Sequence, residues 1–197
     1  DSDAIALKWL ERYRKGFENR SSQRISKLPG TVADPIVSTI IQARLTDLTA
    51  EHLEHIKYAH RLSMSAENIQ GLLLEEFWAE RLGKYGWYCC WGEVVRHVDF
   101  CHGDGSLLQI KNRSNSENSS SSRVRLDQPI TKWFRVDAKT GQYQWSYFQD
   151  QYDDDRFSEA QLGEFVHRVL QTNPDAMAIE SNNPWQQYSG LPLDELD

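Results

Sequence analysis

Asp99, Gln109 and Lys111 are spaced so that a β-hairpin would gather a carboxylate, an amide and an amine at one place. The segment Gly103-Asp104-Gly105 predicts a three-residue hairpin loop, since glycine readily adopts the left-handed conformation that such loops contain. Counting outward from the loop sets Asp99 opposite Gln109 and His97 opposite Lys111. Because side chains alternate between the two faces of a strand, these four polar residues are expected on one face. The other face is expected to be an apolar wall made of Val98, Phe100, Leu108 and Ile110.

This polar cluster has the chemistry needed for phosphodiester hydrolysis. Mg²⁺ prefers hard oxygen ligands and keeps several of its waters, and the hairpin offers the Asp99 carboxylate, the Gln109 amide oxygen and the Ile110 backbone carbonyl. A metal ion there would polarise the scissile phosphate and lower the pKa of a bound water. Lys111 would orient that water or stabilise the charge that develops on the phosphate. His97 is either a general base or, as is commoner, a packed or surface histidine.

A further carboxylate is expected from the helix that precedes the hairpin. Glu75 and Glu76 are neighbours in an apolar, helical stretch, and each shares a helical stripe with buried-type residues. Only one of the two can point toward the hairpin, and helical spacing alone leaves the choice open. A solvated helix face is the alternative for either residue.

The same residues carry a resemblance to known nucleases. Val98-Asp99 followed by Gln109-Ile110-Lys111 resembles the PD-(D/E)xK nuclease superfamily, in a variant where Gln replaces the second acid. Residues 98–125 resemble the SinI-like type II restriction endonucleases more specifically, and the resemblance extends over residues 66–148. The departures are Val98, where the motif has Pro, and Gln109 itself, which gives a metal one negative charge fewer.

That resemblance implies an α/β nuclease core, a homodimer and Mg²⁺-dependent cleavage of both strands of DNA, in a prokaryotic cytoplasm. It also implies a short palindromic target, GGWCC, in which W is A or T. Carried over by position, Asp99 matches the metal-binding acid, Gln109 the second motif position and Lys111 the motif lysine. Two other functions fit the same residues: a structure-specific nuclease of the resolvase or repair type, and a DNA-binding module that has lost catalysis.

Recognition of DNA is expected from the polar stretch that follows Lys111. Residues 112–122 contain no hydrophobic residue, and arginines flank them. Arg reads guanine, Asn pairs with adenine and Ser hydroxyls reach phosphates, although a disordered linker has the same composition. The candidate DNA-binding residues are Arg113, Asn115, Asn118, Ser120, Arg123, Arg125, Lys132 and Arg135.

The net charge of −7 is unevenly distributed, so it does not exclude a nucleic-acid partner. Residues 147–197 carry a net charge of −9 and the rest of the chain +2, and residues 105–139 hold seven Lys or Arg against three acids. Local charge decides attraction to phosphate. A uniformly basic, DNA-coating protein is excluded.

The elements that must position these residues follow from periodicity and capping signals. Helices are predicted at 3–18, 35–44, from Thr49 to about 62 and, capped by Ser65, at 66–82. Strands are predicted at 87–91, 94–101 and 106–111, with a further hairpin of 132–137 and 142–148 around Gly141. Ser158 caps a last helix, and the acidic remainder is expected to be a loosely packed tail. The 197 residues are expected to form one nuclease domain: a helical part at 1–65, a core of mixed sheet and helices at 66–148, and a C-terminal helix with an acidic tail at 149–197.

The three cysteines have no CxxC spacing, which argues against a disulfide framework or a zinc site and favours a reducing cytoplasm. No apolar run approaches the roughly 20 residues that span a bilayer.

Overall fold

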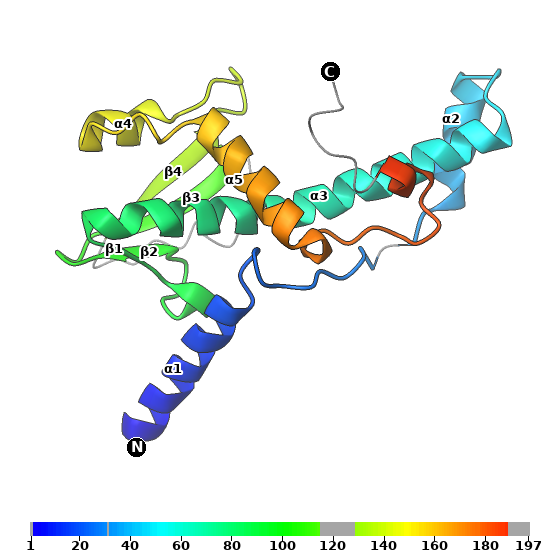
Figure 1. Cartoon of the computed structure of the whole chain (residues 1–197). Helices are drawn as coiled ribbons and strands as arrows, with labels where there is room; N and C mark the ends of the chain where they lie inside the picture. The colour runs from blue at the N-terminus through cyan, green and yellow to red at the C-terminus, as the bar shows by residue number, and fades with distance from the viewer. Residues whose placement is uncertain (1, 31, 115–128, 189–197) are drawn as a thin grey trace. The chain divides into compact units, whose positions relative to one another are not determined.

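The computed structural model describes residues 2–30, 32–114 and 129–188 (Figure 1). The chain forms two compact units, one of residues 1–24 and 70–176 and the other of residues 25–69 and 177–197. The long helix α3 (Ala50–Leu82) contributes its N-terminal part to the second unit and its C-terminal part to the first. None of the described helices is both long and apolar enough to cross a membrane.

The second unit is built from α2 (Pro35–Arg44), the first part of α3 and the short 3-10 helix η5 (Pro184–Tyr188). Asp34 caps α2 by accepting a hydrogen bond from the N–H of Ile36 at 3.0 Å, as its sequence predicts. An ion pair between Arg61 and Glu180 ties the chain after residue 177 to α3. Most of residues 177–188 are nevertheless exposed, and residues 189–197 of the predicted tail lie outside the described part.

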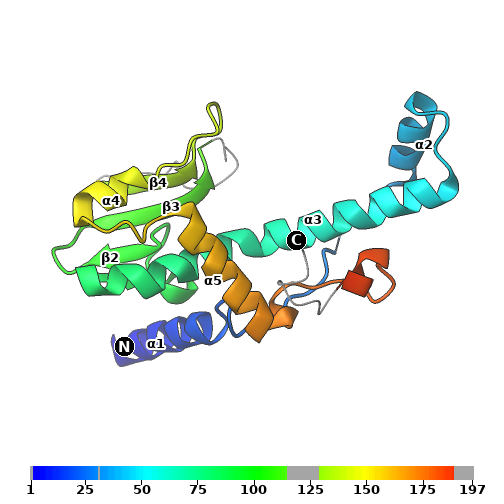
Figure 2. The same cartoon turned by 45° about the horizontal axis from the view of Figure 1, so that its top comes forward.

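The first unit contains a four-stranded sheet in the order β1-β2-β3-β4, of which Figure 2 shows β2, β3 and β4. β1 (Trp87–Cys89), β2 (Phe100–His102) and β3 (Leu107–Arg113) pair antiparallel, whereas β4 (Ile130–Val136) lies parallel to β3. Around it are α1 (Ser2–Glu18), η1 (Gly83–Tyr85), η2 (Trp91–Glu93), α4 (Ser146–Tyr152), α5 (Glu159–Thr172) and η4 (Pro174–Ala176). The mixed sheet flanked by helices, with helices at the N-terminal end of the chain, confirms the predicted α/β fold class.

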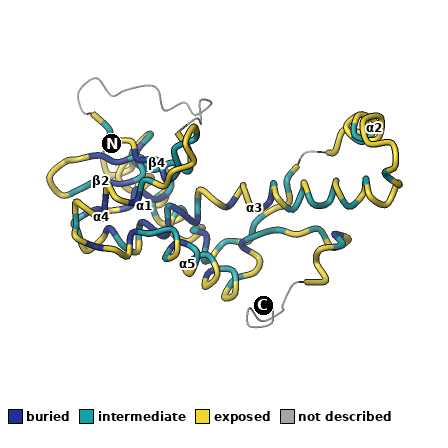
Figure 3. The backbone as a smooth tube through the Cα atoms, turned by 90° about the horizontal axis from the view of Figure 1, so that it is seen from above, coloured by how far each residue is buried: buried dark blue, intermediate teal, exposed yellow. Residues whose placement is uncertain are grey.

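An aromatic core holds the sheet against the C-terminal part of α3. The fully buried Trp78 ring lies 4.9 Å from Trp133 on β4, 4.5 Å from Phe148 and 5.1 Å from Phe157, measured between ring centroids. Phe77 extends the cluster to Phe165 on α5. Figure 3 shows the buried stretches of α3 and the strands in dark blue. Large aromatic side chains provide much apolar area per residue, so this cluster is the main source of cohesion on that face.

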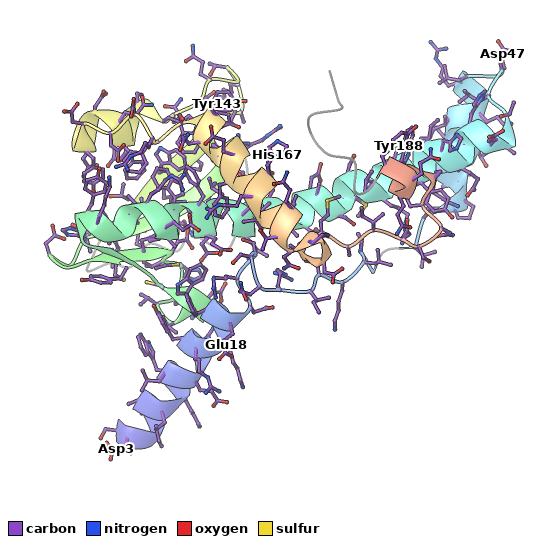
Figure 4. The ribbon with its side chains drawn as sticks, in the orientation of Figure 1. Asp3, Glu18, Asp47, Tyr143, His167 and Tyr188 are labelled. Carbon is purple, nitrogen blue, oxygen red and sulfur yellow. The ribbon has the colours of Figure 1, made fainter. Side chains whose placement is uncertain are left out.

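Helix α1 shows the opposite pattern. Its apolar side chains are largely exposed, among them Ile5 at 69% and Leu10 at 56%. Figure 4 labels Asp3 and Glu18 near its two ends. The helix meets the rest of its unit at η2, where a side chain at Gly16 would lie within 2.6 Å of the Gly92 Cα. Only glycine allows this approach of the two backbones.

Three predicted elements are wrong. Residues 50–82 form one helix instead of two, because no proline or glycine interrupts residues 50–70 and Ser65 lies buried within the helix. Residues 94–99 turn instead of forming a strand, with His97 at a φ of 63°. The predicted hairpin at 132–148 is reduced to a single bridge between Val136 and Tyr143, because β4 pairs with β3 instead.

Candidate active site

The hairpin between β2 and β3 has the predicted register. Phe100 pairs with Leu108, and the N–H of His102 donates to the Ser106 carbonyl at 2.9 Å across the turn. Gly105 has a φ of 92°, the left-handed conformation that the loop requires. One position beyond the Phe100 pair, this register sets Asp99 opposite Gln109.

Asp99 is held by three hydrogen bonds at the point where β2 begins. Its N–H donates to the Leu108 carbonyl at 3.0 Å, and its carbonyl accepts from the Cys90 N–H at 2.8 Å. Its carboxylate oxygen Oδ2 accepts from the Ile110 N–H at 2.7 Å. β2 begins only at Phe100. At Asp99 the side-chain carboxylate therefore accepts the β3 backbone N–H that a neighbouring strand would otherwise bind.

The charges at the site are strongly coupled. Burial raises the pKa of Asp99 to about 6, against the opposing effects of the Ile110 N–H and the Lys111 ammonium. The pKa of Lys111 is lowered by burial and by the nearby Lys132, and Asp99 opposes this shift. Asp99 and Lys111 are therefore close enough for each to stabilise the charge of the other.

Glu75 on α3 is the second carboxylate near Asp99. Burial, together with the negative charges of Asp99 and Glu93, raises its pKa to about 8. Its Oε1 accepts a weak bond from the Cys89 thiol at 3.9 Å. Two partly desolvated carboxylates thus repel each other at one end of the β2–β3 hairpin.

Glu76, its neighbour, points to the segment that follows α1. It is 4% exposed, accepts from the Ser22 N–H at 2.8 Å and pairs with Arg20 at 3.3 Å. The hydroxyls of Ser21 and Ser22 also donate to it. Glu76 therefore anchors the chain after α1, and Glu75 is the member of the pair that lies beside Asp99.

His97 does not join these residues. The prediction that it pairs opposite Lys111 is wrong, because the left-handed turn at residues 94–97 ends the hairpin at Asp99. Val98 also departs from prediction: it packs with Cys90 and Leu107, and Leu107 shares the face of Gln109 instead of that of Phe100.

The parallel register of β3 and β4 shows that the basic candidate DNA-binding residues lie on two different faces of the sheet. Gln109 pairs with Lys132, and Arg113 with Val136, so Gln109, Lys111, Arg113 and Lys132 share one face. Lys132 and Arg113 are exposed there. The candidates Asn115, Asn118, Ser120, Arg123 and Arg125 lie outside the described residues.

Arg135 lies on the opposite face and is 8% exposed. Its guanidinium donates to Asn112 at 3.4 Å, forms an ion pair with Glu159 on α5, and stacks over Tyr143, labelled in Figure 4. These contacts hold the Arg135 side chain in the interior of the fold, on the opposite face of the sheet from Lys111.

Sequence reasoning missed Glu93. It follows Gly92 in η2, both with positive φ, and its charge raises the pKa of Asp99 and of Glu75. The glycine was a local signal of a turn, but no periodicity predicts that this turn folds toward Asp99.

The donor set fits a hard divalent cation. Within the described ranges, no three His, Cys, Asp or Glu side chains converge to hold a metal ion. Mg²⁺ commonly binds through one or two carboxylates and keeps its waters, which matches the pair of Glu75 and Asp99. Burial raises the pKa of both carboxylates, and a bound cation would stabilise their charged forms.

Comparison with known proteins agrees with this geometry. Residues 8–172 match the family described as SinI restriction endonuclease. The chain is 40% identical over 166 residues to the type II restriction enzyme Eco47I of Escherichia coli, covering 82% of this chain and 72% of the relative. It is also 40% identical over 161 residues to the type II restriction enzyme SinI of Salmonella infantis, covering 78% of this chain and 70% of the relative.

Proposed function

Because the chain belongs to the SinI restriction endonuclease family and is thus a type II, site-specific deoxyribonuclease, we propose that it cuts both DNA strands at GGWCC as a Mg²⁺-dependent homodimer. The observation that supports this proposal is the Asp99 carboxylate bound to the Ile110 N–H, with the charge of Lys111 acting on it and its own charge acting on Glu75. The target sequence rests on the resemblance of residues 98–125.

Glu75 and Asp99 are the proposed carboxylate ligands of Mg²⁺, with the Gln109 amide oxygen and the Ile110 carbonyl as neutral donors. When bound, the metal polarises the scissile phosphate and lowers the pKa of an attacking water. The Ile110 N–H holds the Asp99 carboxylate in a fixed orientation, which limits the reorganisation needed for binding.

Lys111 is the proposed cation for the reacting phosphate. It shares its face with Gln109 and lies near Asp99, so its ammonium stabilises negative charge that develops during hydrolysis. Lys132 and Arg113, on the same face, are proposed to contact neighbouring phosphates. The residues proposed to read the bases or to contact the DNA backbone are Arg113, Asn115, Asn118, Ser120, Arg123 and Arg125.

A homodimer follows from the symmetry of the target. A palindrome presents the same phosphate environment on both strands, related by a two-fold axis. The hairpin provides one reaction centre, so two copies of the chain cut the two strands in equivalent ways.

The test is digestion of a mixed-sequence duplex with the purified protein in Mg²⁺ and, separately, in EDTA. We expect discrete fragments with ends at GGWCC in Mg²⁺ alone. Preference for branched DNA would indicate a structure-specific nuclease, and binding without cutting would indicate an inactive DNA-binding module. Either result contradicts the proposal.

A further inference from the structure

Two of the three cysteines lie in contact beside Asp99. The sulfur atoms of Cys90 and Cys101 are 3.2 Å apart. Cys90 directly follows β1, and Cys101 lies within β2, opposite Tyr88. Both belong to the small apolar cluster that contains Val98 and Leu107.

The third cysteine is separated from this pair by strand alternation. Cys89 pairs with Phe100, which is fully buried, and its thiol contacts Glu75. The alternation of side chains therefore keeps Cys89 on the other face of the sheet, away from Cys101. Only one pair of thiols is in a position to react with each other.

Both cysteines lie next to the backbone of Asp99. The Cys90 N–H holds the Asp99 carbonyl at 2.8 Å, and Cys101 is two residues further along the chain. A disulfide requires a sulfur–sulfur distance of about 2.05 Å, so bond formation draws the Cys90 and Cys101 backbones together. The segment that moves is the one that supports the Asp99 carboxylate.

We propose that Cys90 and Cys101 are a modification site that low-molecular-weight disulfides of the glutathione type convert to an intramolecular disulfide, which reversibly suppresses cleavage. The suppression rests on the proposed function, whereas the modification does not. Cys101 is partly exposed and reacts first, whereas Cys90 is 6% exposed.

The chemistry balances as two thiol–disulfide exchanges. The Cys101 thiolate attacks the reagent, whose S–S bond breaks to release one thiol and leave a mixed disulfide. The Cys90 thiolate then attacks the Cys101 sulfur, and the second reagent thiol leaves. The two protein thiols are oxidised, the reagent disulfide is reduced, and the two protons end on the released thiols.

The test is incubation of the folded protein with oxidised glutathione, followed by alkylation under denaturing conditions and mass spectrometry. We expect a product with the mass of the reduced chain minus two hydrogen atoms plus one alkyl modification, with Cys90 and Cys101 in one cross-linked peptide and Cys89 alkylated. Cys89→Ser is the matched control and gives the same cross-link; Cys101→Ser and Cys90→Ser do not. A stable glutathione adduct without a cross-link, a cross-link through Cys89, or an unmodified chain would each overturn the proposal.

A cleavage assay measures the consequence for function. We expect oxidised wild-type protein to cut at least about tenfold more slowly, since displacement of a catalytic group by a fraction of an ångström to 1 Å has effects of this size or larger. Dithiothreitol restores the rate, and the same oxidation leaves Cys101→Ser unchanged. Full activity of cross-linked protein would overturn the suppression. Protein that is inactive even when reduced would contradict the proposed nuclease function, and the mass measurement would still decide the modification.

Discussion

The two faces of the β3–β4 strand pair differ in what they contribute. Leu108, Trp133 and Arg135 belong to the face covered by α3 and α5, where aromatic rings and the Arg135–Glu159 ion pair are buried. Lys111 and Lys132 belong to the other face, where the charge of Lys111 lies near Asp99. Residues that are neighbours in sequence therefore serve stability and chemistry separately.

The same separation occurs on α3. Glu75 and Glu76 are consecutive, yet Glu76 has buried hydrogen-bonding partners and Glu75 faces other carboxylates. A fully paired buried carboxylate stabilises the fold, whereas an unpaired one costs free energy until a cation binds. The ionised form of Glu75 is therefore electrostatically unfavourable, although the aromatic core on the same helix is well packed.

Trp133→Ala tests the supporting face and has the largest expected effect. Removal of this ring leaves a cavity beside Trp78 and Trp145, and the free energy of unfolding falls by about 3–5 kcal/mol. Urea unfolding followed by circular dichroism measures the loss. A decrease below about 1 kcal/mol would mean that the two faces share the stabilising role.

Lys111→Ala tests the reacting face. We expect the cleavage rate to fall by about 10²–10³-fold or more, because a cation next to the phosphate is lost. Specific binding in a gel-shift assay stays within about tenfold of wild type, since other phosphate and base contacts dominate affinity. The melting temperature should stay close to that of wild type, and wild-type cutting rates would remove Lys111 from the mechanism.

From Asp99 to Lys111 the sequence predicted the register of the hairpin, because a three-residue loop and period-two alternation act locally. It predicted Asp99 beside Gln109 and Lys111 for that reason, and the pairing of Phe100 with Leu108 has this register. It could not distinguish Glu75 from Glu76, because both share helical stripes and the decision depends on Arg20, Ser21 and Ser22, far away along the chain. It misassigned residues 142–148 because parallel pairing of β4 with β3 is a long-range event that leaves no local pattern.

Glu75→Gln and Glu76→Gln should change stability in opposite directions. Glu76→Gln breaks the pairing with Arg20 and weakens the buried bonds to Ser21 and Ser22, so we expect a loss of about 1–3 kcal/mol at pH 7. Glu75→Gln removes a carboxylate that is costly to ionise and should stabilise the protein at high pH. Thermal unfolding in EDTA measures both variants.

The pH window for Glu75 follows from its pKa. The folded chain holds this proton up to about pH 8, whereas the unfolded chain releases it near the ordinary value of 4.5. Because the folded state binds the proton more tightly, wild-type stability declines as pH rises from 4.5 toward 8 and stays low above it. Glu75→Gln should match wild type near pH 4 and exceed it by several kcal/mol at pH 9, because a pKa raised from 4.5 to about 8 corresponds to roughly 5 kcal/mol. A constant difference across this range would contradict a raised pKa of the buried Glu75.

Lys132→Gln has the smallest expected effect and sharpens the comparison of the two faces. Lys132 is exposed beside Gln109, so loss of its charge should weaken binding similarly for specific and non-specific DNA. The slope of log K against log salt should fall by about 1, the amount expected for one phosphate contact. Stability should not change, in contrast to Arg135→Gln, which removes a buried ion pair on the opposite face. Fluorescence anisotropy across a salt series measures the slope. An unchanged slope would mean that Lys132 does not contact a DNA phosphate.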